Sequence, residues 1–236
     1  YSTSPLLGNH LEDTKILPLT RDGHGLVTIP SSPPEQNQIT YDIKMVLNNN
    51  QSVEVDLVER KTGHDGVGEI VFHKNMKQSD EKEIYCKWVQ KLIPAAELNT
   101  HKLESKTNEF VTTVNFQAKK ILRDVNGKLY LGPNIVDMDK KTFKKRKRET
   151  DVFFSYAYEK TINLDIDIGD GFTIEKIPAS KTLENDFFEF SIVAEGQGNN
   201  VKIKTVMTRK VDRVPVEQYK EFRKLWRQYL KLAKSQ

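Results

Sequence analysis

The sequence contains only one cysteine, Cys86, among 236 residues, which excludes a disulfide within the chain. It also has no long hydrophobic run. A membrane-spanning helix needs about 20 predominantly apolar residues, so we expect no transmembrane segment. The chain begins Tyr1-Ser2-Thr3, with neither an initiator Met nor a charged-then-apolar signal segment, which indicates a processed or truncated product.

Signatures of nucleotide binding, serine hydrolysis and zinc catalysis are absent. The sequence has no Gly-x-Gly-x-x-Gly, P-loop, nucleophile elbow or His-Glu-x-x-His motif. The histidines are scattered without the close pairing of a metal site: His10, His24, His64, His73 and His101. We therefore expect no cofactor and no metal.

What is present is the composition of an ordinary globular protein. Hydrophobic residues make up 37% of the chain and charged residues 30%, and the length suffices for one large or two small cores. The net charge is only +4, so the protein is not expected to bind nucleic acid in general.

Alternation of apolar and polar residues predicts β-strands along most of the sequence. Asn126-Gly127 is a strong hairpin turn signal, and residues 195–200 supply the types that tolerate a hairpin loop. The predicted strands are 39–47, 52–60, 68–73, 109–118, 187–194 and 201–208.

Two helices are predicted. The first carries Asp80 and Glu83 in capping-box spacing and ends before Pro94. The second opens at Val214-Pro215 and has a basic side opposite an apolar face. We expect that face to pack against the sheet or to form an interaction surface through Tyr219, Phe222, Trp226 and Tyr229.

These patterns predict a mainly β protein, with one or two antiparallel β-sandwich domains and an amphipathic helix on each half, the last one C-terminal. Residues 1–36 contain five prolines and no periodicity, which indicates an extended lead-in. We place a β domain with one helix at 37–123 and a second β domain at 124–236. A single continuous sandwich is the alternative.

The C-terminal part resembles a known family. Residues 171–178 (Gly-Phe-Thr-Ile-Glu-Lys-Ile-Pro), Asn185-Asp186-Phe187 and residues 214–223 (Val-Pro-Val-Glu-Gln-Tyr-Lys-Glu-Phe-Arg) are similar to the C-terminal β-rich region of bacterial transglutaminase-like multidomain proteins. Weaker similarities lie at residues 23–27, 63–68, Gly132-Pro133 and Arg148.

In those proteins an N-terminal β domain and a papain-like core precede this region. The resemblance implies a non-catalytic accessory region in the periplasm or cell envelope, whose partner is the catalytic core of its own parent chain. The Cys-His-Asp triad would belong to that core. Asp13, the nearest candidate here, lacks the usual setting of the triad aspartate, and Cys86 is expected to be a small hydrophobe at the edge of an apolar helical arc.

Two further binding hypotheses come from the residues themselves. The basic run 140–148 suggests a polyanion site, with contacts from Lys144, Lys145, Arg146 and Lys147, although such runs are more often solvated linkers. A glycan-binding module would instead need exposed aromatics, such as Tyr156 and Tyr158, on one flat surface.

The stretch 163–171 hints at a calcium loop. Counted from Asp165, however, position 6 is Asp170 instead of glycine and position 12 is Lys176 instead of glutamate. We therefore interpret it as a strand with Leu164, Ile166 and Ile168 inward, followed by a turn. Asn50-Gln51-Ser52 is a glycosylation sequon only in a eukaryotic secretory setting.

Overall fold

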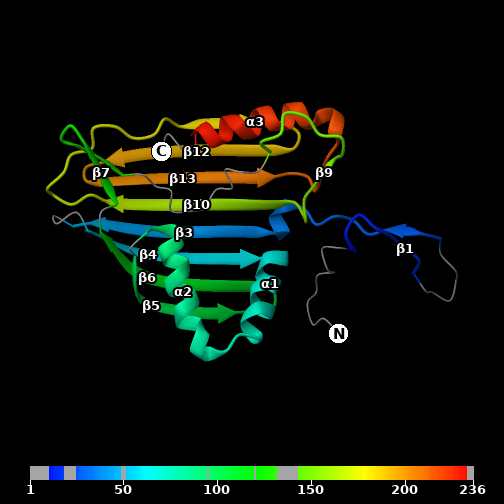
Figure 1. Ribbon diagram of the computed structural model, residues 1–236, viewed down its shortest axis with the longest axis horizontal. Coiled ribbons are helices and arrows are strands. Elements are labelled where there is room, and N and C mark those ends of the chain that lie inside the picture. The colour runs from blue at the N-terminus through cyan, green and yellow to red at the C-terminus, as the bar shows by residue number, and fades with distance from the viewer. Residues whose placement is uncertain are drawn as a thin grey trace.

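The computed structural model describes residues 11–18, 25–48, 52–94, 96–119, 121–131 and 143–232. Its centre is one sheet of eight strands, in the order β11-β12-β13-β10-β3-β4-β6-β5 (Figure 1). These strands are β3 (Gln38–Leu47), β4 (Ser52–Thr62), β5 (Glu97–Ser105), β6 (Glu109–Lys119), β10 (Tyr158–Asp167), β11 (Lys181–Glu184), β12 (Phe188–Gln197) and β13 (Asn200–Arg209).

Three small two-stranded sheets surround the large one. Their strands are β1 (Lys15–Ile16) with β2 (Val27–Thr28), β7 (Leu122–Val125) with β8 (Lys128–Leu131), and β9 (Val152–Phe153) with β14 (Arg213–Val214). The α-helices are α1 (Gly63–Lys74), α2 (Gln78–Leu92) and α3 (Tyr219–Leu232), and two 3-10 turns are η2 (Pro34–Gln36) and η3 (Val216–Gln218).

One face of the large sheet is apolar and buried. Side chains directly opposite each other on paired strands point to the same side. Ile43 of β3 lies opposite Leu57 on one neighbour and Leu164 on the other, and Val55 lies opposite Phe116. All five are buried. The alternate residues form the other face, which carries exposed polar side chains. The alternation of apolar and polar residues in the sequence thus corresponds to the two faces of the sheet.

All three helices cover the apolar face. Phe190 of β12 and Phe110 of β6 belong to one register row that crosses the sheet. Tyr229 of α3 packs on Phe190, with ring centres 4.7 Å apart, and His73 of α1 stacks on Phe110 at 4.4 Å. In Figure 1, α1 and α2 lie in front of β4, β6 and β5, while α3 lies at the other end beside β12.

The mainly β fold, with a helix in each half and the last one C-terminal, is therefore confirmed. The arrangement of layers differs from the expected sandwich. Among the described residues the second layer consists of helices instead of a second sheet, because the aromatic faces of α2 and α3 cover the apolar side of the strands.

The two halves predicted from the sequence meet in the middle of this sheet. Residues 38–119 supply β3 to β6, and residues 158–209 supply β10 to β13. The junction is a parallel pairing of β3 with β10, in register from Gln38 opposite Glu159 to Val46 opposite Asp167. The two halves thus share one sheet and one hydrophobic core.

The prediction of a strand at 68–73 is wrong, because these residues belong to α1. Glycines lower the helix propensity of the first turn of α1, but close packing requires two of them, Gly63 and Gly66. A Cβ atom on Gly66 would lie 2.5 Å from the Lys61 carbonyl oxygen and 2.6 Å from that of Asn108. Gly63 adopts φ +64° and is equally crowded, so the glycines let the start of α1 approach the sheet.

Several local predictions are confirmed. The first predicted helix is α2, which ends at Leu92 before Pro94, as expected. The predicted capping box is wrong, because α2 begins at Gln78, its N-cap is Lys77 without a side-chain hydrogen bond, and Asp80 lies in the first turn. Asn126 and Gly127, with φ of 56° and 78°, form the predicted turn between β7 and β8. The calcium-loop segment is strand β10 followed by a turn, with Leu164 and Ile166 buried. No helix in the described part of the chain has the length and apolarity to cross a membrane.

Neighbouring residues on β12 allow a direct test of the two faces. Ile192 is 2% exposed on the helix side, and Val193 is 47% exposed on the other. Ile192→Ala is expected to lower the free energy of unfolding by about 2–5 kcal/mol, because it leaves a cavity in the core. Val193→Ala, the control, should change it by no more than about 0.5 kcal/mol. Urea denaturation measures both values, and equal losses would contradict the assignment of the faces.

Candidate functional site

The aromatic residues predicted on the last helix pack against the sheet. Tyr219, Phe222 and Tyr229 are buried, and Trp226 is partly buried. Phe188 of β12 contacts both Trp226 and Tyr229, with ring centres 5.7 and 5.5 Å away. The sequence left open whether this face packs against the sheet or forms an interaction surface, and the described structure shows packing.

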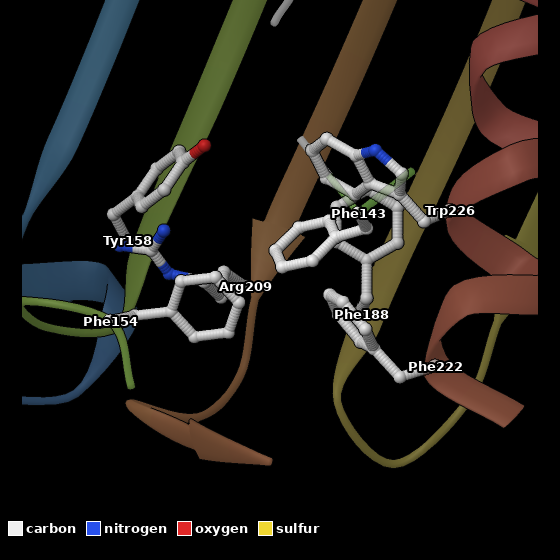
Figure 2. Close-up of a pocket in the computed structure, with 7 residues that line it drawn as sticks. All are labelled: Phe143, Phe154, Tyr158, Phe188, Arg209, Phe222 and Trp226. Carbon is white, nitrogen blue, oxygen red and sulfur yellow. The ribbon is translucent and has the colours of Figure 1, made fainter. Parts of the chain in front are cut away.

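A pocket of about 250 Å³ opens between the base of this helix and the sheet (Figure 2). Six of the seven residues that line it are aromatic, and the seventh is an arginine. They are Phe143, Phe154, Tyr158, Phe188, Arg209, Phe222 and Trp226.

Arg209, the last residue of β13, is the only charged residue in the pocket lining. Its guanidinium carbon lies 4.4 Å from the centre of the Phe154 ring and 4.3 Å from that of Tyr158, which is cation–π geometry. Its Nε and Nη2 atoms donate to the Tyr156 carbonyl oxygen at 3.1 and 2.5 Å. Burial lowers the pKa of Arg209. No carboxylate in the described part of the chain forms an ion pair with it, although Asp65 and Asp212 favour its charge from a greater distance.

Two further polar groups belong to the pocket residues. The Trp226 indole N–H is buried and has no hydrogen-bond partner among the described residues. Burial also raises the pKa of Tyr158, so its hydroxyl stays protonated at neutral pH. The pocket thus combines aromatic walls with hydrogen-bond donors.

Sequence reasoning missed Arg209, although a signal was available. In β13 every second residue points to the helices, including Ile203 and Met207. Arg209 continues this period, and an arginine at an inward position is unusual enough to suggest a function. The aromatic residues around it come from separate segments, which no local pattern could have joined.

The basic run lies against α3. The Tyr219 hydroxyl donates to the Lys145 carbonyl oxygen at 2.9 Å, and Arg223 donates to the carbonyl oxygens of Phe143 and Lys144, both at 3.0 Å. The segment's own side chains are exposed: Lys144, Lys145, Arg146, Lys147 and Arg148. Residues 140–142 of the predicted run lie outside the described residues.

A second cluster of polar groups fixes the N-terminal segment to the body. The Glu12 carboxylate accepts a hydrogen bond from the Ser32 hydroxyl at 2.6 Å and lies 2.6 Å from His64 Nε2. The side chain of Asn37, which is completely buried, donates to Ser32 Oγ and to the Ala157 carbonyl oxygen and accepts from the His64 amide. Glu12 itself is only 8% exposed. We call Glu12, Ser32, Asn37 and His64 the anchor cluster.

The anchor cluster contains a serine, a histidine and a carboxylate, yet its geometry is not that of a catalytic triad. In a triad the serine and the acid contact opposite ring nitrogens of the histidine. Here Ser32 and Glu12 both contact Nε2, at 3.3 and 2.6 Å. Since the carboxylate only accepts, Nε2 carries a proton, and the Ser32 hydroxyl proton is directed at Glu12. This arrangement joins segments of chain and does not activate a nucleophile.

The remaining candidate residues from the sequence do not form one site. Cys86 is partly buried on α2. His73 Nε2 lies 2.7 Å from the Tyr85 hydroxyl, and His101 Nε2 lies 2.8 Å from a Glu81 carboxylate oxygen. Asp13 is exposed at φ 55°. No group of histidine, cysteine or acidic residues in the described ranges could hold a metal ion, and His10, His24, Asn50 and Gln51 lie outside those ranges.

The two tyrosines considered for glycan binding do not form a flat exposed surface. Tyr156 packs on His64 in a tilted arrangement, with ring centres 4.9 Å apart, and Tyr158 packs on Arg209. Burial raises the pKa of both. Their faces are occupied by protein side chains, so the platform that a glycan would need is not made by these residues.

Comparison with known proteins gives one family. Residues 127–236 match DUF3858. It is described as a domain of unknown function with a solved structure, and the match covers less than half of the chain. No curated protein matches. Among solved structures, a candidate protease from Parabacteroides distasonis gives a TM-score of 0.33 at 10% identity, over 37% of this chain and 17% of that chain. A likeness at this level carries no argument about fold or function.

The anchor cluster predicts a dependence of stability on pH. Burial opposes the ionisation of Glu12, but hydrogen bonds from Ser32 and His64 outweigh it and lower the pKa of Glu12 below its usual 4.5. A lowered folded-state pKa stabilises the protein above the unfolded-state pKa, and this contribution is lost as the pH falls through the folded-state value. Glu12→Gln should cost about 1.5–3 kcal/mol at pH 7 and progressively less below about pH 4.5.

Urea denaturation of both proteins from pH 7 to pH 3 measures this difference. Glu35→Gln is the matched control, because it removes an exposed carboxylate of the same segment. A difference between Glu12→Gln and the unaltered protein that stays constant over the whole pH range would contradict the prediction.

Proposed function

We propose that this chain is a non-catalytic accessory and interaction region, which docks onto a transglutaminase-like cysteine-enzyme core that precedes it in the parent protein. The observation that carries the proposal is the two-stranded ribbon β1–β2, which we call the N-terminal arm. In Figure 1 the arm projects from the end of the sheet, away from its body.

The arm exposes apolar side chains where a free ribbon would be polar. Leu17 is 61% exposed and Leu26 is 67% exposed, while Ile16 and Val27 form an exposed cross-strand pair. A two-stranded ribbon is marginally stable by itself in water, and adjoining exposed apolar residues indicate an interaction site. A partner that covered these four residues would stabilise the arm.

The base of the arm is held by hydrogen bonds, so a partner bound to the arm would have a defined position relative to the sheet. Besides the anchor cluster, Asp13 and Ile29 join the two sides of the arm through a backbone hydrogen bond of 2.9 Å, and Ser31 donates to the Asp212 carboxylate at 2.8 Å. The arm lies at the N-terminal side of the chain, where the proposed core would be connected. A region of this kind would orient the core and shape the approach to its active site.

The proposal is tested first by the sequence of the parent gene upstream of Tyr1, and then by hydrogen exchange. A papain-like core with a cysteine, a histidine and an aspartate should precede Tyr1. Amides of the arm should exchange about tenfold or more slowly in the parent protein than in this chain alone, because docking adds upward of about 1.4 kcal/mol to local opening.

Leu17→Asp combined with Leu26→Asp should remove that protection in the parent protein. Val46→Asp, at an exposed position on the open face of the sheet, is the control and should not. An unrelated sequence before Tyr1, or equal exchange in the two proteins, would overturn the proposal. So would a hydrolase or transferase activity of this chain that is lost in Cys86→Ala.

A second candidate function is polyanion binding, which the position of the basic run favours. Hydrogen bonds hold residues 143–145 along the first turns of α3. The outer side of that helix adds exposed cations at Lys220, Lys224 and Arg227, although Glu217 and Glu221 partly offset them. The run and the helix together thus offer a larger cationic surface than either alone.

Heparin is a suitable probe of this surface. Binding to a polyanion releases counterions, so the affinity should fall steeply with salt, and each lost contact should lower the slope of log K against log salt by roughly 0.7–0.9. Changing Lys144, Lys145, Arg146 and Lys147 together to Ala should therefore reduce the slope by about 3.

The control removes the same number of charges elsewhere. Its four positions are exposed lysines outside this surface: Lys44, Lys181, Lys202 and Lys204. Equal slopes for the two variants would assign the binding to net charge alone and would exclude the basic run as a specific site.

A further inference from the structure

No described carboxylate forms an ion pair with Arg209, which is partly buried, although Asp65 and Asp212 act on its charge from a greater distance. A buried cation is costly unless an anion or several acceptors compensate it. The Tyr156 carbonyl oxygen, two aromatic faces and the more distant Asp65 and Asp212 compensate the charge, but no anion contacts the guanidinium directly. An anionic ligand would complete the environment of this residue.

The guanidinium also retains free donors. Arginine has five N–H groups, and the Tyr156 carbonyl oxygen occupies Nε and one hydrogen of Nη2. Three N–H groups remain, two on Nη1 and one on Nη2, and one from each nitrogen can bind a carboxylate through two parallel hydrogen bonds. Aromatic rings lie over the guanidinium plane, so a ligand can reach it only at its edge (Figure 2).

We propose that this pocket binds a hydrophobic monocarboxylate, with the carboxylate on Arg209 and the apolar body against Phe143, Phe188 and Trp226. A single cation matches a single negative charge, whereas a phosphate dianion would need further cations that the lining lacks. The walls are otherwise aromatic, which suits an aromatic or branched aliphatic body. The site does not depend on the proposed function of the arm.

The size of the pocket limits the ligand to about one large side chain. Its volume of about 250 Å³ is below the roughly 300–1,000 Å³ that is usual for drug-sized molecules. Two sources share this chemistry: a free hydrophobic acid, and the C-terminal residue of a peptide. Both present one carboxylate beside one apolar group.

Fluorescence of Trp226 reports directly on the pocket. The chain has two tryptophans, and Trp88 lies on α2 against Tyr85, so the Trp88→Phe variant leaves Trp226 as the signal. In that variant 3-phenylpropionate should change the fluorescence in a saturable way. The neutral 3-phenylpropionamide should bind at least about tenfold more weakly, because it cannot pair with the guanidinium. This comparison needs no change in the pocket itself.

Arginine substitutions test the assignment of the charge. Arg209→Met should abolish the difference between the acid and the amide, and Arg209→Lys should weaken the acid about tenfold or more, because an ammonium lacks the planar fork. Arg213→Met is the matched control, since Arg213 also lies over an aromatic ring, Phe153, but outside the pocket. It should leave both ligands unaffected.

Peptides separate the two sources. A tetrapeptide that ends in phenylalanine with a free carboxylate, compared with its C-terminal amide, should bind more tightly than 3-phenylpropionate if the source is a peptide terminus. Binding of the acid alone would assign the site to free acids. The proposal is overturned if the acid and the amide bind equally, if neither binds, or if inorganic phosphate displaces the acid at equal concentration.

Discussion

The parallel pairing of β3 with β10 is the contact on which the rest of the molecule depends. These strands are separated by more than a hundred residues, and their ladder turns two groups of four strands into one sheet. Asn37 stands at one end of this ladder. Its carbonyl oxygen accepts from the Glu159 amide at 3.0 Å, and its buried side chain reaches Ser32, Ala157 and the first turn of α1. Asn37 thus connects the base of the arm, the start of α1 and the start of β10.

This junction also joins the base of the arm to the aromatic pocket. The Tyr156 ring packs on His64 of the anchor cluster, and the Tyr156 carbonyl oxygen accepts two hydrogen bonds from Arg209. The aromatic pocket and the base of the arm therefore share one residue just before β10. Because β10, β13 and α3 each contribute to the pocket, its shape follows from packing in the core and not from a loop alone.

Local structure could be predicted from the sequence wherever one physical period dominates. Alternation placed Ile43 and Leu57 on the buried side, and the helical arc placed Tyr219 and Phe222 against the sheet. Gly66 could not be interpreted from local sequence. It lowers the helix propensity of its own segment, but a carbonyl oxygen of another segment lies too close for any larger residue. The same is true of the site. No sequence pattern near Arg209 predicts contact with Phe143 or Phe154, because these residues come together only after the strands have paired.

The edges of the large sheet limit how this protein can meet other chains. An unpaired strand offers free N–H and C=O groups to any neighbour, and short, irregular or charged edges prevent such pairing. At one edge β11 has only four residues. At the other, β5 shifts register between Leu98 and Thr100 and carries Lys102 and Glu104 as an ion pair. Both edges are thus poor templates for another strand. We therefore expect this protein to bind partners through side-chain contacts and not by adding a strand to the sheet.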